Sequence, residues 1–210
     1  MLDALGHALA VVARPEVAER WADDSALAGM TVGGLVGHLL QTIRRAEATL
    51  DGPSPPGALG RPVDWYGANR ATTPADVESD EVHRFIRDDG ERVAGRGRDA
   101  VIDHLERVVE RLPACLAANP AGRTVEVWRT KRAVPLADYL ASRVVELLVH
   151  ADDVAASVGL EPPDPPPEAA AIAERFLLDV ARGRAGDTAV LRALTRAERD
   201  DDPGDVLRVL

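Results

Sequence analysis

Apolar residues recur at helical spacing along most of this chain, and polar segments rich in proline or glycine separate the repeats. The pattern predicts helices over residues 2–21, 30–50, 74–92, 101–116, 135–158 and 169–182. Thr31 is placed to cap the second of these helices through its side chain, and Pro135 suits the first turn of the fifth. Residues 123–128 alternate instead as a short strand or an extended connection does. The sequence therefore predicts an all-α fold.

The proline-rich segment 161–167 divides the chain by composition and is expected to be a stiff linker. We expect one globular domain over residues 1–160 and a short helical tail over residues 168–210. The N-terminal segment carries Asp3 and His7 where a secretory signal would carry Lys or Arg. We therefore interpret this segment as a first helix of the domain.

Charge and cysteine content narrow the classes of partner. The formal net charge is −10, so the overall field attracts neither nucleic acid nor an anionic membrane. No apolar run approaches the roughly 20 residues that a membrane-spanning helix needs. The single cysteine, Cys115, cannot form an intramolecular disulfide and lies on an apolar helical stripe, where we expect a core residue. These features predict a cytoplasmic protein in a reducing compartment.

Four polar residues share one face of the helix predicted over residues 135–158. Successive helical residues advance by about 100°, which brings four side chains into one sector: Arg143, Glu146, His150 and Asp153. The other sides of this helix are apolar, so we expect the helix to be buried in a bundle with these side chains inside. A buried carboxylate or imidazolium needs compensation from a network of ion pairs or from a bound cation.

A third candidate metal ligand comes from the second predicted helix. His38 is the only ionisable residue of the apolar run TVGGLVGHLLQT. With Glu146 and His150 it would supply two nitrogens and one oxygen to a metal and leave a position open, which is typical of a catalytic site. A buried hydrogen bond between His38 and Glu146 without a metal is the alternative that spacing leaves open.

Three glycines, Gly33, Gly34 and Gly37, come just before His38. Glycine inside a helix costs about 1 kcal/mol relative to alanine. We expect a compensating gain, either close backbone approach or open space beside the imidazole of His38.

Two segments about a hundred residues apart, WADDSALAGMTVGGLVGHLLQT and LADYLASRVVELLVHADDVAASVG, together resemble the mycothiol-dependent maleylpyruvate isomerase family of the DinB-like superfamily. The resemblance covers roughly residues 5–160 and implies a four-helix bundle with a long crossover connection. It also implies a divalent metal held by His38, Glu146 and His150. Zinc is the preferred ion, with nickel, iron or manganese as options for such mixed ligands.

The resemblance also assigns roles around the metal. Arg143 and Asp153 match the family's arginine before the glutamate and its aspartate after the second histidine, and we expect them to orient the ligands or a bound carboxylate. Gly34 and Gly37 are expected to leave room beside His38 for the thiol cofactor. The bias towards Ala, Arg, Asp and Gly is typical of an actinobacterial source, which would make mycothiol available.

The leading hypothesis is a metal-dependent enzyme that uses mycothiol to transfer a thiol to, or to isomerise, a small electrophile. A metal-binding stress or ligand-binding protein without turnover is one alternative, and a hydrolase using zinc-bound water with Asp153 as base is another. Maleylpyruvate isomerase itself has a large C-terminal α/β domain, whereas about 45 residues follow the linker here, so we do not expect maleylpyruvate as the substrate. A homodimer is the expected assembly.

Overall fold

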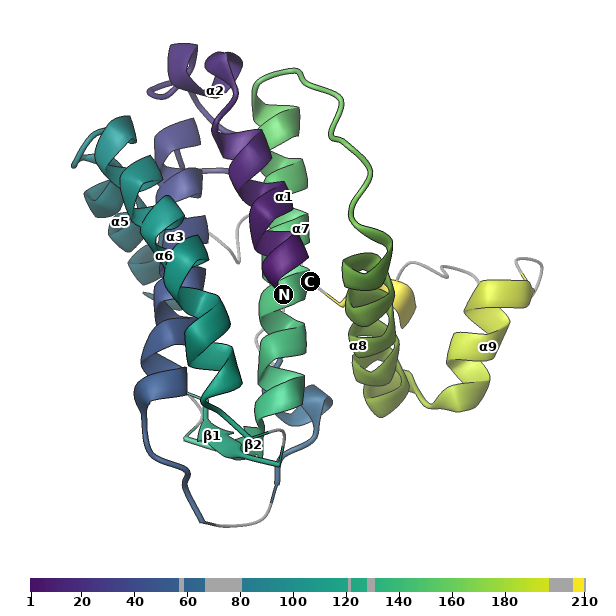
Figure 1. Ribbon diagram of the computed structural model, residues 1–210. Helices are drawn as coiled ribbons and strands as arrows, with labels where there is room; N and C mark the ends of the chain where they lie inside the picture. The colour runs from purple at the N-terminus through teal and green to yellow at the C-terminus, as the bar shows by residue number, and fades with distance from the viewer. Residues whose placement is uncertain (57–58, 67–80, 121, 128–130, 197–205, 210) are drawn as a thin grey trace.

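A computed structural model describes residues 1–56, 59–66, 81–120, 122–127, 131–196 and 206–209 (Figure 1). Four helices form its body: α1 (Leu2–Val12), α3 (Val32–Asp51), α6 (Arg98–Ala117) and α7 (Leu136–Ser157). Helix α1 contacts α6 and α7, and α3 contacts the same two helices from the other side, so the four close a ring around one core. Large apolar side chains from all four fill it, among them Leu5, Leu35, Leu39, Leu105 and Leu147. The predicted all-α, DinB-like fold is confirmed.

The long crossover connection follows from the directions of the helices. Helices α1 and α7 run one way, while α3 and α6 run the other way, side by side and parallel (Figure 1). Consecutive parallel helices cannot be joined by a short loop. The chain between them includes a 3-10 turn, η1 (Pro62–Asp64), and helix α5 (Glu81–Ala94), which returns along α3.

The prediction of one helix over residues 2–21 is wrong, because two helices form there. Helix α1 ends at Val12, and a separate short helix, α2 (Pro15–Glu19), follows. Pro15 occupies the first turn of α2, where its missing N–H is harmless. In the interior of one continuous helix the same proline would remove a hydrogen bond and clash with the preceding turn.

The boundaries of the helices that carry the site agree with the sequence. The Thr31 hydroxyl caps α3 by accepting a hydrogen bond from the Gly34 amide at 2.9 Å, as predicted. Helix α7 begins directly after Pro135. Helix α5 was expected to start near Pro74, in a segment (residues 67–80) outside the described residues, and it ends at Ala94.

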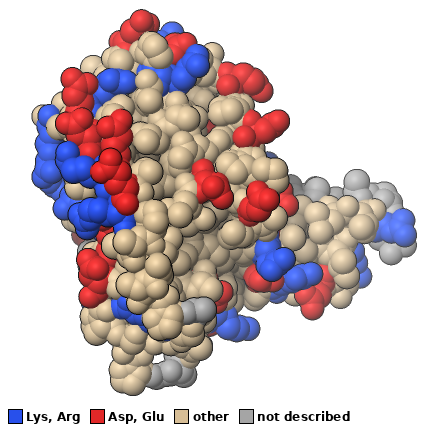
Figure 2. All heavy atoms as spheres, in the orientation of Figure 1, with Lys and Arg blue, Asp and Glu red and all other residues tan. Residues whose placement is uncertain are grey.

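A small hairpin and two further helices complete the described chain. Strand β1 (Thr124–Glu126) confirms the predicted strand and pairs antiparallel with β2 (Ala133–Pro135), which leads into α7. Beyond α7 the chain reaches α8 (Pro167–Ala185), which packs on α7, and then α9 (Asp187–Thr195). In the part of the chain that is described, no helix is long and apolar enough to cross a membrane. Figure 2 shows acidic and basic side chains mixed along the α5 and α6 side of the bundle, which therefore presents no field of a single sign.

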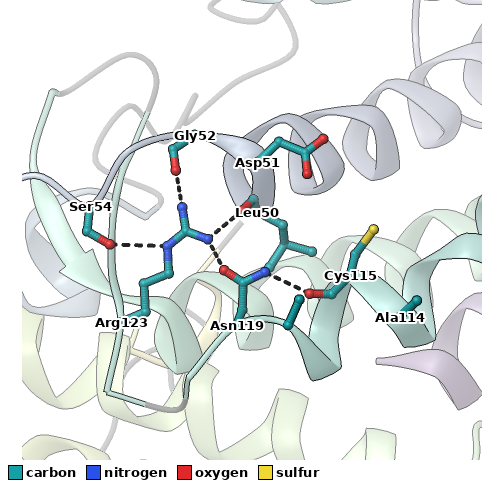
Figure 3. A pocket seen from close by; sticks show the side chains of 9 residues that line it. Leu50, Asp51, Gly52, Ser54, Ala114, Cys115, Asn119 and Arg123 are labelled. Atoms are coloured by element: carbon teal, nitrogen blue, oxygen red, sulfur yellow. Dashed lines mark hydrogen bonds between the residues drawn. The ribbon is translucent and has the colours of Figure 1, made fainter.

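Arg123 links the C-terminal ends of α3 and α6 (Figure 3). Its guanidinium donates hydrogen bonds to the carbonyls of Leu50 and Gly52 and to the side chain of Asn119. These carbonyls belong to the last turn of α3 and its cap, where a positive charge complements the helix dipole. A groove of about 620 Å³ beside Arg123 is lined in part by Cys115, which is half-buried rather than fully enclosed in the core.

Candidate metal centre

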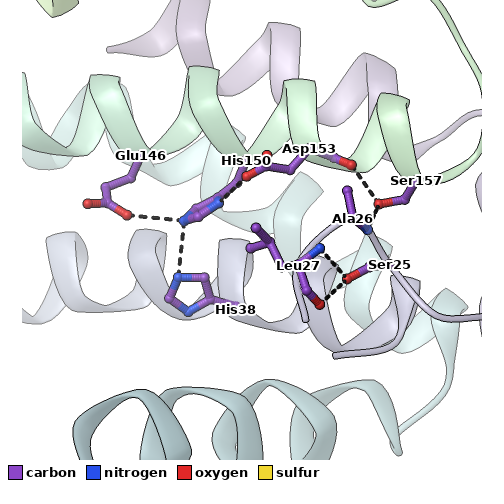
Figure 4. A network of polar contacts seen from close by, with 8 residues as sticks. All are labelled: Ser25, Ala26, Leu27, His38, Glu146, His150, Asp153 and Ser157. Atoms are coloured by element: carbon purple, nitrogen blue, oxygen red, sulfur yellow. Dashed lines mark hydrogen bonds and ion pairs between the residues drawn. The ribbon is translucent and has the colours of Figure 1, made fainter. Parts of the chain in front are cut away.

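The polar faces of α3 and α7 meet inside the bundle. Because the two helices are antiparallel, His38 near the start of α3 lies opposite His150 near the end of α7. Their Nε2 atoms are 3.2 Å apart, and the imidazole rings meet edge to face with centroids 4.7 Å apart (Figure 4). Two side chains that are 112 residues apart in sequence therefore converge on one point.

Glu146 adds an oxygen to this pair of nitrogens. Its Oε2 atom lies 3.2 Å from Nε2 of His150, one helical turn away on α7. The ligand atoms of His38, Glu146 and His150 all lie within 4.8 Å of one another. Two atoms bound to one zinc ion at 2.0–2.1 Å with a tetrahedral angle stand about 3.3–3.4 Å apart. The two pairs that share Nε2 of His150, each 3.2 Å apart, have nearly this spacing, so the donor set fits a divalent metal.

Asp153 fixes the orientation of His150 (Figure 4). Nδ1 of His150 lies 3.0 Å from Oδ2 of Asp153 and donates its proton to that carboxylate. This leaves Nε2 to face His38 and Glu146, an arrangement common to histidines that bind metals. The hydroxyl of Ser157 donates to the Asp153 carbonyl at 2.6 Å and accepts from the Ala26 amide at 2.8 Å, which anchors this end of α7 to the loop before α3.

The three candidate ligands differ in their protonation. Burial, followed by the charge of His150, lowers the pKa of His38 to about 3. Burial also disfavours protonation of His150, but hydrogen bonds to Asp153 and Glu146 outweigh it and raise its pKa to about 9. Burial would raise the pKa of Glu146, whereas the hydrogen bond from His150 and the charge of Arg143 hold it below its ordinary value.

These shifts describe how the buried cluster is balanced without a metal. A protonated His150 lies between the carboxylates of Glu146 and Asp153, and a neutral His38 accepts at its Nε2. One proton thus stands where a divalent cation would bind the same atoms. The sequence allowed two ways to compensate the buried charges, a network of ion pairs or a bound cation. In the structure these correspond to a proton and a metal that compete for the same site.

Arg143 lies next to the ligands and is held from several sides. Its Nη2 is 4.0 Å from Oε1 of Glu146, and its Nε donates to the Ser142 hydroxyl at 3.2 Å. The guanidinium carbon also lies over the ring of Tyr139, 5.3 Å from the centroid. These contacts leave only 14% of the side chain exposed. Arg143 is therefore fixed beside the candidate metal ligands, on the side away from Asp153.

Two aromatic residues after η1 cover the same end of the site. Trp65 and Tyr66 are both buried, and their rings pack with Tyr139 of α7 and Phe176 of α8 at centroid distances of 5.0–6.5 Å. The hydroxyl of Tyr66 is buried beside the carboxylate of Glu146. Burial and the Glu146 charge raise its pKa, so the hydroxyl stays protonated.

The glycines before His38 face a different neighbour from the one expected. A Cβ atom at Gly37 would lie 2.3 Å from the carbonyl oxygen of Gly90, and one at Gly34 would lie 2.1 Å from the Glu91 carboxylate. Both neighbours belong to α5, so the space expected for a thiol beside these two glycines is occupied by that helix. Of the two gains predicted for the glycines, the structure shows close backbone approach.

A comparison with known protein families matches the segment that contains this site. The family model described as mycothiol maleylpyruvate isomerase N-terminal domain matches residues 2–155. The chain belongs to this family. The matched segment contains α1, α3 and nearly all of α7, with His38, Glu146 and His150. Searches of curated proteins and of solved structures give no match.

Membership in the mycothiol maleylpyruvate isomerase N-terminal domain family confirms the resemblance drawn from the two sequence segments. One residue near the site was missed by the sequence analysis. Arg45 is half-buried on α3, and burial together with the nearby charge of Arg143 lowers the pKa of its guanidinium. Its spacing of seven residues from His38, two helical turns, was the signal that could have placed it on the same face.

Proposed function

We propose that this protein is a metal-dependent enzyme that joins a low-molecular-weight thiol, mycothiol by preference, to a small electrophile, in either transfer or isomerisation. The observation that carries the proposal is the convergence of two imidazole nitrogens and one carboxylate oxygen within 4.8 Å inside an apolar bundle. The family match supports the choice of thiol.

The donor set supports a catalytic rather than a structural metal. Among the described residues, the cluster contains three donors, His38, Glu146 and His150. Structural zinc sites usually have four protein ligands, whereas catalytic sites have three and an exchangeable position. A divalent metal held there would lower the pKa of a bound thiol or polarise a substrate carbonyl.

The surrounding residues prepare the site for such chemistry. Asp153 keeps the Nδ1 proton of His150 in place, so Nε2 stays available as a ligand. Glu146 remains ionised beside Arg143, which keeps its carboxylate ready to bind a cation. Glu146 and His150 keep less than a fifth of their side-chain surface exposed, and this partial burial strengthens the electrostatic contacts between these groups. Addition of a thiolate to an activated double bond then gives transfer, and rotation followed by elimination gives isomerisation.

The position of Asp153 argues against the hydrolase alternative. A zinc-water hydrolase would need Asp153 as a base beside the metal-bound water. Its carboxylate instead accepts a hydrogen bond from Nδ1 of His150, on the side of the ring that faces away from Nε2. Asp153 is therefore engaged in orienting a ligand.

The test is metal analysis of the purified protein followed by a conjugation screen. Mycothiol and glutathione would each be offered with a panel of small electrophiles, before and after removal of the metal with a chelator. We expect about one divalent metal per chain and turnover that requires both the metal and mycothiol. A stoichiometric metal with no turnover of either thiol would favour the alternative of a binding protein.

A further inference from the structure

Helix α8 borders the candidate metal centre, although it lies beyond the segment that matches the family. The matched segment ends at residue 155, and α8 begins at Pro167. Helix α8 packs beside α7, which carries Glu146 and His150, and it also contacts η1 (Figure 1). A Cβ atom at Gly183 of α8 would lie 2.6 Å from Cβ of Val63 in η1, so the two elements approach each other closely. The C-terminal part of the chain therefore contacts the helix that carries two candidate ligands.

One aromatic cluster joins α8 to η1 and to α7. Phe176 of α8 is 4% exposed, and its ring meets the ring of Tyr66 edge to face at a centroid distance of 5.0 Å. The ring of Trp65 lies 5.9 Å from that of Phe176 and stacks on Tyr139 of α7 at 6.5 Å. Edge-to-face and offset-stacked rings at such distances attract each other. Phe176 therefore stabilises the position of the Tyr66 ring, and Trp65 connects the pair to α7.

Tyr66 connects this aromatic cluster to a candidate ligand. Its side chain is 5% exposed, and its hydroxyl interacts with the carboxylate of Glu146 through charge and a hydrogen bond. An ionised carboxylate can only accept, so the hydroxyl is the donor. Carboxylates that bind metals are usually held by hydrogen bonds from neighbouring groups, which set their orientation. Tyr66 is in the position of such a neighbour.

The short turn before Tyr66 fixes its backbone but not the direction of its ring. Turn η1 contains three residues, and the amides of Trp65 and Tyr66 donate hydrogen bonds to the Pro62 carbonyl at 3.3 and 2.9 Å. A single 3-10 turn is short, and its hydrogen bonds have poor geometry. The direction of the Tyr66 ring must therefore come from close packing with its neighbours, of which Phe176 is the nearest aromatic ring.

We propose that α8 is part of the metal centre, in which Phe176 holds the ring of Tyr66 so that the Tyr66 hydroxyl orients the carboxylate of Glu146 as a ligand. Phe176 and Tyr66 are positioning residues, because they act through Glu146 and do not bind the ion themselves. The inference rests on the metal of the proposed function, and it does not depend on the thiol or the electrophile.

The test measures the affinity of the full-length protein for cobalt, by competition with a chromogenic chelator. The visible absorption of the bound cobalt reports the geometry of its ligands in the same samples. Tyr66→Phe keeps the ring and removes the hydroxyl alone. We expect its cobalt affinity to fall about 10–100-fold, as for other groups behind metal ligands, and its absorption bands to change. Phe176→Leu should lower the affinity about tenfold and change the same bands.

The double variant separates positioning from general packing. If Phe176 acts through the Tyr66 hydroxyl, Phe176→Leu has nothing further to remove in a Tyr66→Phe background. The double variant should then bind cobalt as Tyr66→Phe does. Independent effects would multiply instead. A double variant that is weaker than Tyr66→Phe by the full factor of Phe176→Leu would overturn the positioning role.

Val180→Ala is the matched control, because Val180 is fully buried one turn further along α8. It should lower the stability in denaturant unfolding, as Phe176→Leu does, and leave the affinity and absorption of cobalt at their native values. An equal loss of affinity in Val180→Ala would reduce the effect to stability and overturn the inference. Unchanged affinity in Tyr66→Phe would also overturn it, even if Phe176→Leu fails to fold, because Tyr66→Phe preserves the packing of the ring.

The outcomes also separate this inference from the proposed function. Native protein that binds no cobalt would overturn both, since the metal is common to them. Native protein that binds cobalt no more tightly than every variant would overturn the role of α8 alone. The expected losses of affinity, in a protein that turns over neither thiol, would support the role of α8 and favour the alternative of a binding protein.

Discussion

Helix α3 has two faces that perform opposite tasks. The face towards α7 carries long polar side chains, His38 and Arg45, that meet partners across the bundle. The face towards α5 carries Gly34 and Gly37, whose lack of side chains lets the α5 backbone approach at Gly90. Gly37 and His38 are consecutive residues, so the change from backbone packing to site chemistry occurs within a single step of the helix.

The two faces of α3 therefore contribute to different properties: the face towards α5 to stability, and the face towards α7 to binding. The α5 side contributes close contact that any added atom would disrupt, because the neighbour is a backbone carbonyl that cannot rotate away. The α7 side holds buried charge that needs a cation or a proton to balance it. Changes on the α7 side should therefore alter binding more than folding, and changes on the α5 side should do the reverse.

The largest expected effect is the loss of metal binding in His150→Ala. This variant removes one of three donors and leaves the apolar core of the bundle in place, so we expect stoichiometric metal binding to disappear with the helical signal retained. Metal analysis and circular dichroism measure the two. His104→Ala, on α6 outside the cluster, is the control and should bind metal normally. Unfolding of His150→Ala would show instead that the metal is structural.

The next effect is on the other face of α3. Gly37→Ala would place a Cβ atom 2.3 Å from the carbonyl oxygen of Gly90, so α3 and α5 would have to separate. We expect a loss of about 1–3 kcal/mol in the free energy of unfolding, as for other overpacked sites, with metal stoichiometry unchanged in the folded protein. Denaturant unfolding measures it. Gly6→Ala in α1 has open space around it and should gain about 0.5–1 kcal/mol. An unchanged free energy of unfolding in Gly37→Ala would contradict the proposed difference between the two faces of α3.

A smaller change is expected at Asp153, behind the site. Asp153→Asn weakens the hydrogen bond that Nδ1 of His150 donates to this side chain, while preserving the shape of the side chain. Comparable changes behind metal ligands reduce metal affinity about 10–100-fold. Competition with a chromogenic chelator measures the affinity, and Asp152→Asn, the exposed neighbour, controls for the lost charge. Equal affinities for the two variants would show that Asp153 has no part in the site.

The smallest effect, taken over one unit of pH, is the dependence of metal affinity on pH. His150 is protonated at neutral pH because its pKa is raised to about 9, and it must lose that proton to bind a metal. His38, with its pKa lowered to about 3, has no proton to lose there. Apparent affinity should therefore fall about tenfold for each unit of pH below 9, with one proton released per metal. Calorimetry in buffers of different ionisation enthalpy counts the protons; a count of zero or two would contradict these pKa shifts.

Local patterns made much of the fold and of the cluster predictable. Helical periodicity located the bundle helices, and a histidine alone on an apolar helix identified His38 as a partner for Glu146 and His150. Thr31 signalled the start of α3 because capping depends on the next three residues alone. Each of these signals lies within a few turns of one helix.

The features that the sequence did not predict depend on contacts between distant segments. The spacing of seven residues from His38 could have placed Arg45 on the same face of α3, but its proximity to Arg143 depends on how α3 packs against α7. The occupant of the space beside Gly37 depends on which helix packs there, and spacing within α3 cannot say that α5 does. The division of the first helix at Pro15 is, by contrast, a local effect, because the preference of proline for the start of a helix outweighed the apolar pattern.

A crystal structure of the zinc-loaded protein tests the central claim most directly. We predict one ion bound by Nε2 of His38, Nε2 of His150 and a carboxylate oxygen of Glu146, each at about 2.0–2.2 Å, with the remaining position held by solvent. Anomalous diffraction would identify the ion. An ion bound elsewhere, or one closed by a fourth protein side chain at this cluster, would contradict the account of an open metal centre between α3 and α7.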